Sequence, residues 1–364
     1  MWSKLCKGEH GLSVINDALS DPAMAVSYPS VTSALQTAAG VHLAGFVPRG
    51  AAPGCFNEKE IFGRSVSKEM SLVSQFAVFA ADMALKNAGI SSANQSLKCV
   101  RSGSDICMTR VGVSIGSGGI GPLVDINETQ KALSTSYKKV SPYFVPKILV
   151  NMPAAQVSIR HGLKGPVHAV ATACAAGSHS IGDAFNFIRL GYADMMLAGG
   201  SEACIDDLTI AGFARMKALS ASKDPANAST PFNSSRDGFV ISEGAGVIVL
   251  EDLEHAIQRN APIIAEIIGY GLSGDAFHLT SPSPVQPLTT TTTTTTAATT
   301  ATTTATTKPS SATAKTFLGG AQRAMMQVAL AYYDSTTTAV HRMKKKEIIA
   351  IIYFILCLLY MYTY

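Results

Sequence analysis

Short, continuously apolar segments are the feature that most constrains the fold of this chain. Four of them stand out, at residues 111–116 (VGVSIG), 193–200 (ADMMLAGG), 246–251 (GVIVLE) and 263–269. Runs of this length predict strands, and their lack of polar alternation predicts that both faces of the sheet are covered. Residues 76–88 instead have helical spacing and stop at Gly89. Strands that alternate with helices indicate an α/β layered fold.

The overall composition narrows the class of protein further. The length of 364 residues accommodates two domains or one large α/β unit, and the net charge of +4 is small for that length. Because no basic stripe with interleaved aromatic residues occurs, we expect no nucleic-acid partner. The seven cysteines are odd in number, scattered and free of any C-x-x-C pair. This usage predicts a reducing compartment, without a disulfide framework or a zinc site.

Cys174 lies at the most informative junction of the chain. Residues 168–173 predict a buried strand. From Gly177 onward the apolar residues have helical spacing, at Ile181, Ala184, Phe185 and Ile188. A thiol at this junction lies at a helix N-terminus, where the macrodipole favours the nucleophilic thiolate. We therefore predict a catalytic cysteine, and a buried structural cysteine is the alternative.

Ordered sequence blocks around this cysteine resemble a known family, the β-ketoacyl-acyl-carrier-protein synthases. The wording is most similar to that of the elongating bacterial type II and mitochondrial enzymes. The blocks are residues 141–166, 170–188 (VATACAAGSHSIGDAFNFI), 193–203 (ADMMLAGGSEA), 218–222 (ALSAS), 231–256 and 269–284. The resemblance extends over roughly residues 1–284 and again over 319–330.

The resemblance implies a thiolase-like layered αβαβα fold of class α/β, in which two similar halves each carry a mixed five-stranded sheet. This chain would hold mainly the N-terminal half and part of the linker to the C-terminal half. The implied reaction is a decarboxylative Claisen condensation in fatty acid biosynthesis. The implied partner is acyl carrier protein, which brings acyl and malonyl thioesters to a homodimer. No cofactor, metal, nucleic acid or membrane is implied.

By the same resemblance, Cys174 carries the acyl chain as a thioester, and its own backbone N–H is one of two oxyanion donors. Gly177 and Gly182 would allow close helix packing around the thiol, or would serve ordinary helix–sheet contact. His179 is five residues further on, about 500° around a helix, so it points away from Cys174 and is not expected to be catalytic.

Two further positions are candidate substrate-binding residues. Phe239, in a block implied to lie beside the active site, lines the acyl pocket or is a core aromatic. His278, in a loop implied to border the entrance, contacts substrate or is a surface histidine. The block of residues 236–246 is otherwise expected to form a buried ion pair and tight turns. In this block and just before it, the sequence departs from the family wording at Thr230, Asn233 and Ser242.

Several family motifs do not occur in the chain. Neither the HGT block nor the second histidine motif of the C-terminal half is present, and the histidines after Cys174 are His179, His255, His278 and His341. The GFGG-type loop of the second oxyanion donor is also missing. We therefore expect a catalytically incomplete chain, truncated at both ends, with an interior strand of the first sheet missing. The alternatives are a non-catalytic fragment that binds acyl carrier protein or dimerises, and an inactive product of a faulty gene assembly.

The chain divides into five expected segments. Residues 1–256 form the N-terminal synthase domain, and residues 257–284 begin the C-terminal half. Residues 285–318 are a Thr/Ala-rich linker with little to bury, residues 319–332 a residual helix, and residues 333–364 a basic and apolar tail of non-native character. The apolar run at 348–362 is shorter than the roughly 20 residues of a bilayer span. No transit peptide is visible, and the expected compartment is mitochondrial or cytoplasmic.

Overall fold

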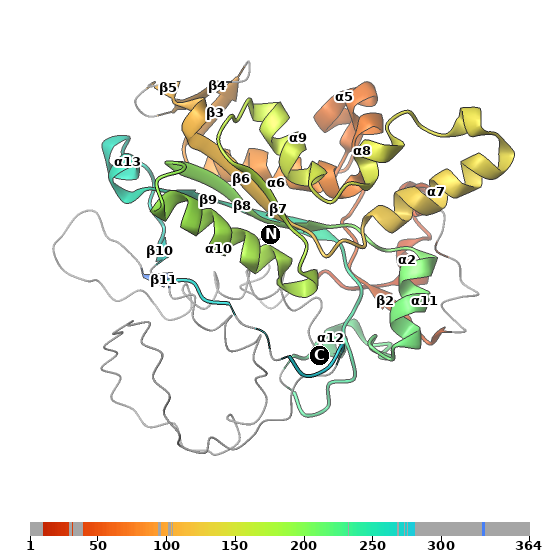
Figure 1. Ribbon diagram of the computed structural model, residues 1–364. Helices are drawn as coiled ribbons and strands as arrows, with labels where there is room; N and C mark the ends of the chain where they lie inside the picture. The colour runs from red at the N-terminus through yellow and green to blue at the C-terminus, as the bar shows by residue number, and fades with distance from the viewer. Residues whose placement is uncertain are drawn as a thin grey trace. The chain divides into compact units, whose positions relative to one another are not determined.

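A computed structural model describes residues 10–28, 31, 39–93, 96–100, 103, 105–231, 233–267, 269–272, 274, 276–280 and 330–331 (Figure 1). These residues belong to two compact units. Of the described residues, those from 10 to 265 form the first unit and those from 266 to 331 the second.

A four-stranded mixed sheet forms the centre of the first unit. Its order is β7 (Val167–Val170), β6 (Val111–Gly116), β8 (Met195–Glu202) and β9 (Gly244–Glu251). β6 is parallel to both β7 and β8, whereas β9 runs antiparallel to β8. The strands predicted at residues 111–116, 193–200 and 246–251 are therefore confirmed, within two residues at each end.

Helices cover both faces of this sheet (Figure 1). α6 (Leu72–Asn87) and α9 (Met152–His161) lie on one face, and α10 (Ala176–Arg189) lies on the other. Because side chains alternate along a strand, Met195 and Leu197 of β8 pack with α6, while Met196 and Ala198 pack with Ala184 of α10. This double burial explains why the strands are continuously apolar, as the sequence predicts.

The expectation of a missing interior strand is wrong. Neighbouring strands from β7 to β9 are hydrogen-bonded to each other in an unbroken series. The backbone groups between these four strands are therefore paired, and a further strand could join this sheet only at an edge.

Shorter elements surround the sheet in the first unit. The strands are β1 (Ser13–Val14), β2 (Leu43–Ala44), β3 (Ile90–Ala93), β4 (Ser96–Cys99) and β5 (Asp105–Ile106). The helices are α2 (Ile15–Ala18), α3 (Pro22–Ser27), α5 (Glu58–Glu69), α7 (Pro122–Thr135), α8 (Phe144–Ile148), α11 (Asp207–Arg215), α12 (Pro225–Ala228) and α13 (Leu253–Gln258), with 3-10 turns at Met108–Arg110, Tyr137–Lys139 and Ala173–Ala175. β3, β4 and β5 form an antiparallel sheet of their own.

The helix predicted at residues 76–88 begins one turn earlier, at Leu72. Ser71 caps it, because its hydroxyl accepts a hydrogen bond from the backbone N–H of Ser74. The helix ends at Asn87, and Gly89 follows with φ +70°, a left-handed conformation that suits glycine. The predicted stop at Gly89 is therefore confirmed.

In the second unit, β10 (Glu266–Ile267) pairs antiparallel with β11 (Leu330–Ala331). The strand predicted at residues 263–269 is thus limited to two residues. The helix predicted at 319–332 is wrong at Leu330 and Ala331, because their backbone pairs with β10. The rest of that segment, the Thr/Ala-rich tract and the tail lie outside the described residues. Within the described part of the chain, no helix is long and apolar enough to cross a bilayer.

Candidate active site

Cys174 lies in a sharp turn between a strand and a helix. β7 ends at Val170, three residues before the predicted end, and Cys174 occupies the 3-10 turn Ala173–Ala175 that leads directly into α10. Within this turn Ala173 has φ +50°, a left-handed conformation that is rare for residues other than glycine. The turn leaves Cys174 half-buried next to exposed residues 171–173.

Glycines let the start of α10 approach the sheet. A Cβ atom at Gly116 would lie 2.9 Å from the backbone nitrogen of Gly177, and closer still to the carbonyl group of Ala176. A Cβ at Gly200 would lie 3.2 Å from the Cα of Gly177, whereas one at Gly177 would meet only ordinary contacts. The close approach predicted for Gly177 therefore depends chiefly on the strand glycine Gly116 facing it.

Hydroxyl groups fix the first turns of α10. The hydroxyl of Ser180 donates to the carbonyl oxygen of Ser114 at 2.5 Å and lies 2.9 Å from the hydroxyl of the same residue. Both serines are fully buried. Thr172 Oγ1 and His179 Nδ1 are 2.8 Å apart, so the imidazole is tied to the residues just before the cysteine turn. Sequence periodicity gave no signal for either contact.

The expectation of a thiolate favoured by the helix is not met. Burial raises the pKa of the Cys174 thiol to about 11, and its own backbone N–H lowers it only in part. Removal of the thiolate from water therefore outweighs this backbone hydrogen bond. The helix that follows the cysteine is present as predicted, but Cys174 is protonated at neutral pH.

Glu202, at the end of β8, holds the glycine-rich loop after β6. One carboxylate oxygen accepts hydrogen bonds from the backbone N–H of Gly118 at 2.9 Å and the hydroxyl of Ser117 at 3.2 Å. The other oxygen accepts from the backbone N–H of Ala203 at 3.2 Å. Burial nevertheless raises the pKa of Glu202. This carboxylate links the ends of two adjacent strands, and the sequence analysis did not single it out.

The buried ion pair predicted in the block of residues 236–246 exists, but its basic partner comes from elsewhere. Arg49 lies 3.4 Å from Glu243, and both side chains are buried. Tyr28 donates a hydrogen bond to the same carboxylate. Arg236 is only half-buried and donates to the carbonyl oxygen of Asn233 at 2.8 Å. An arginine almost 200 positions away in the sequence cannot be paired with Glu243 by local reading.

Phe239 and His278 occupy different environments. Phe239 is buried in an apolar cluster and its ring packs edge-on against that of Phe213, with centroids 5.2 Å apart. This places it in a core position and leaves its role at an acyl pocket a proposal. His278 belongs to the second unit, where it is exposed and its Nδ1 accepts from the backbone N–H of Thr280 at 3.1 Å.

A family model described as "Beta-ketoacyl synthase, N-terminal domain" matches residues 1–256. The chain is 48% identical over 243 residues to the mitochondrial 3-oxoacyl-[acyl-carrier-protein] synthase of Arabidopsis thaliana, a match covering 66% of this chain and 50% of the relative. It is 46% identical over 232 residues to 3-oxoacyl-[acyl-carrier-protein] synthase 2 of Rhizobium meliloti, covering 63% of this chain and 53% of the relative.

Solved ketosynthases share the fold. One similar structure is a type II polyketide synthase acyl-carrier protein in complex with its ketosynthase, with TM-score 0.58 and 28% identity over 78% of this chain and 60% of that one. The chain therefore belongs to the β-ketoacyl synthase family and has its thiolase-like α/β fold. It contains the family's N-terminal domain and spans about half the length of these two curated relatives.

Proposed function

We propose that Cys174 accepts an acyl group in thioester linkage, the first half of the 3-oxoacyl-acyl-carrier-protein synthase reaction of fatty acid biosynthesis. The observation that carries the proposal is the half-buried thiol on a left-handed turn between β7 and α10. The proposed donor is acyl carrier protein, and the similar ketosynthase bound to such a carrier supports it.

The proposed step transfers the acyl group between two sulfur atoms. The Cys174 sulfur attacks the thioester carbonyl carbon, the bond from that carbon to the carrier sulfur breaks, and the carrier leaves as a thiol with the proton lost by Cys174. The backbone N–H of Cys174 is the proposed donor to the oxyanion of the tetrahedral intermediate. Because the pKa of the thiol is about 11, we expect slow acylation at neutral pH.

We expect the second half of the reaction, decarboxylation of malonyl-carrier protein and condensation, to fail in this chain. That half depends on the two histidine motifs that the sequence does not contain. Two of the histidines after Cys174 are engaged elsewhere. His179 Nδ1 lies 2.8 Å from Thr172 Oγ1, and His255 Nδ1 lies 2.6 Å from Glu251 Oε1.

The experiment separates the two halves. The protein is incubated with acyl-carrier protein and digested, and the acylated peptide is identified by mass spectrometry; malonyl-carrier protein is then added and the 3-ketoacyl product is measured. We expect acylation at Cys174, its loss in Cys174→Ala, its retention in Cys107→Ala and no ketoacyl product. A folded protein that is never acylated at Cys174 contradicts the proposal, and turnover to ketoacyl product contradicts the predicted incompleteness.

A second candidate is a non-catalytic dimer. β7 is one of the two terminal strands of the sheet formed by the described residues, and Val167 on it is 46% exposed. Such an edge can pair with its counterpart in a second copy. Light scattering with Val167→Lys tests this, with Leu253→Lys on α13 as a matched exposed control. A dimer unaffected by Val167→Lys, or a monomer at all concentrations, excludes pairing through β7.

The proposed compartment is the mitochondrion, with a bacterial-type cytoplasm as the alternative. Support comes from the relatives, since the plant relative is named mitochondrial and the Rhizobium relative is bacterial. Fractionation of cells that express the native transcript tests this. Recovery of the protein in a secretory fraction would contradict both alternatives.

A further inference from the structure

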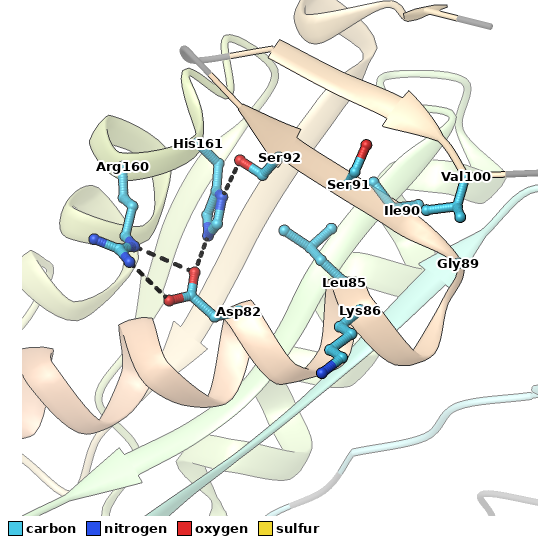
Figure 2. A pocket seen from close by; sticks show the side chains of 10 residues that line it. All are labelled: Asp82, Leu85, Lys86, Gly89, Ile90, Ser91, Ser92, Val100, Arg160 and His161. Atoms are coloured by element: carbon cyan, nitrogen blue, oxygen red, sulfur yellow. Dashed lines mark hydrogen bonds and ion pairs between the residues drawn. The ribbon is translucent and has the colours of Figure 1, made fainter. Parts of the chain in front are cut away.

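A pocket of about 650 Å³ lies among α6, β3 and α9, elements other than those that carry Cys174 (Figure 2). Its wall combines apolar side chains with a small group of polar ones. Among the residues that line it are Asp82, Leu85, Ile90, Ser92, Arg160 and His161. Because Asp82, Ser92, Arg160 and His161 converge at one end (Figure 2), this pocket has the general form of a small-molecule site.

A chain of polar contacts connects three of these residues (Figure 2). Ser92 Oγ lies 2.8 Å from His161 Nδ1, and His161 Nε2 lies 3.0 Å from a carboxylate oxygen of Asp82. The second of these contacts is a short ion-pair distance rather than an aligned hydrogen bond. Ser92 is exposed and the side chain of His161 is only 3% exposed. An accessible hydroxyl thus faces a buried imidazole backed by a carboxylate.

Arg160 holds the carboxylate in place. Its guanidinium donates to one oxygen of Asp82 at 3.2 Å and lies 3.0 Å from the other. Burial, the largest single influence, acts to raise the pKa of Asp82, but the hydrogen bonds and charges of His161 and Arg160 together lower it. Asp82 is therefore ionised at neutral pH, and a negative charge beside Nε2 favours the tautomer with its proton on that nitrogen. Nδ1 is then free of a proton and can accept the hydroxyl hydrogen of Ser92.

We propose that Ser92, His161 and Asp82 act as nucleophile, general base and orienting carboxylate of a second reactive site, which cleaves small carboxylic esters. This role does not depend on the acyl transfer proposed for Cys174. The same three groups in mutual contact activate serine in hydrolases of unrelated folds. Here Ser92 lies beside Nδ1 and Asp82 beside Nε2, so Nδ1 is the nitrogen that accepts the proton of Ser92.

The proposed reaction has two balanced steps. Ser92 Oγ forms a bond to the ester carbonyl carbon while its proton passes to His161 Nδ1; the bond to the alcohol oxygen breaks and the alcohol leaves with that proton. Water then attacks the acyl-serine ester, His161 takes a proton from the water and returns it to Ser92 Oγ, and a carboxylic acid is released. Asp82 stabilises the imidazolium in both steps.

The apolar wall defines the class of substrate. Leu85 and Ile90, both almost fully buried, form the apolar floor beside the polar group, and a short alkyl or aryl acyl chain can pack against it. The cavity volume of about 650 Å³ is ample for a small ester. General-base assistance contributes about 10²- to 10⁴-fold to such reactions, so we expect a measurable but modest activity.

A fluorophosphonate probe tests the proposal, because it phosphonylates activated serines. The full chain is labelled, digested and mapped by mass spectrometry, and hydrolysis of p-nitrophenyl butyrate is measured in parallel. The matched variants are Ser92→Ala and Ser91→Ala, since Ser91 is its exposed strand neighbour and points away from His161 (Figure 2). We expect label on Ser92, loss of label in Ser92→Ala and retention in Ser91→Ala. His161→Gln should slow labelling by about a hundredfold or more.

Three outcomes would overturn the proposal. They are an unlabelled Ser92 in the folded protein, equal labelling of Ser92→Ala, and wild-type labelling of His161→Gln. If His161→Gln does not fold, the two serine variants still decide the matter, because both sites are exposed. A purely structural contact between α6, α9 and β3 predicts no labelling. Mapping the label to a peptide also distinguishes this site from reaction at Cys174.

Discussion

Gly116→Ala is the substitution expected to disturb the cysteine turn most directly. Gly116 ends β6, and the start of α10 packs on it without any intervening side chain. A methyl group there would lie 2.9 Å from Gly177 N and nearer still to the carbonyl of Ala176, whereas real Cβ contacts do not fall below about 3.0 Å. Because all the opposing atoms are backbone, no side chain can rotate away, and the first turn of α10 must move from the sheet.

The magnitude follows from this overpacking. An added methyl group in a well-packed interior costs about 1–3 kcal/mol, which lowers the melting temperature by about 2–4 °C per kcal/mol for a domain of this size. The hydrogen bonds of Ser180 to Ser114 lie one turn further along and should weaken with the same shift. Thermal unfolding followed by circular dichroism gives the stability, and alkylation of Cys174 by iodoacetamide reports the geometry of the turn.

Gly177→Ala is the matched control on the opposite side of the same contact. A Cβ at Gly177 has its nearest neighbour 3.7 Å away, an ordinary contact, and alanine is favoured over glycine inside a helix by up to about 1 kcal/mol. We expect this variant to be as stable as the wild type or slightly more stable. If Gly116→Ala melts at the wild-type temperature, or if Gly177→Ala is the more damaging change, the close approach of β6 and α10 is not as described.

Three further predictions concern ionised groups. With a pKa of about 11, Cys174 should react with iodoacetamide at a rate that is still rising above pH 9. A hydrogen bond with Thr109 lowers the pKa of the exposed Cys107, so its reaction rate should level off at a lower pH. A plateau for Cys174 below pH 8 would refute the burial argument. Arg49→Met leaves buried Glu243 without its cation and should destabilise the protein by about 3–5 kcal/mol. Because burial raises the pKa of Glu243, this loss should grow as the pH rises from 5 to 8, and a pH-independent loss in urea unfolding would argue against it. The lowered pKa of Asp82 gives stability that is present above the unfolded carboxyl pKa of about 4 and is lost as the pH falls through the folded value. The difference in unfolding free energy between wild type and Asp82→Asn should therefore shrink in acid. A difference that stays constant with pH would contradict this assignment.

The buried strands and the helices around them could be predicted because burial on both faces leaves a local sequence signal. The runs at residues 111–116 and 193–200 are apolar for the reason that the structure shows, with helices on both sides. The start of α6 was predicted one turn late, although Leu72 and Val73 continue the helical apolar spacing of Phe76 and Ala77. The cap at Ser71 is the local signal that marks the boundary. The sheet order depends on pairings between distant segments, and no local pattern determines it.

At the candidate active site, the sequence located Cys174 between strand and helix but not its ionisation. The left-handed conformation of Ala173 has no signal in an alanine side chain. The partner of Glu243 was missed because Arg49 becomes its neighbour only in the folded chain. Contacts of Ser92 with His161, and of His161 with Asp82, likewise join residues about 70 to 80 positions apart.

The raised pKa of Cys174 has opposite effects on the formation and the persistence of an acyl-enzyme. At pH 7.5 a thiol with a pKa of about 11 is ionised in roughly one molecule out of several thousand, which slows attack on an incoming thioester. Once the thioester has formed, its sulfur is neutral and burial no longer disfavours it. A thiolate of high pKa is also a poor leaving group, so exchange back to an external thiol should be slow as well. We therefore expect an acyl group on Cys174 to outlast the same group on exposed Cys107 when both are exposed to a free thiol. Faster release from Cys174 would show that the turn stabilises the departing thiolate more strongly than burial disfavours it.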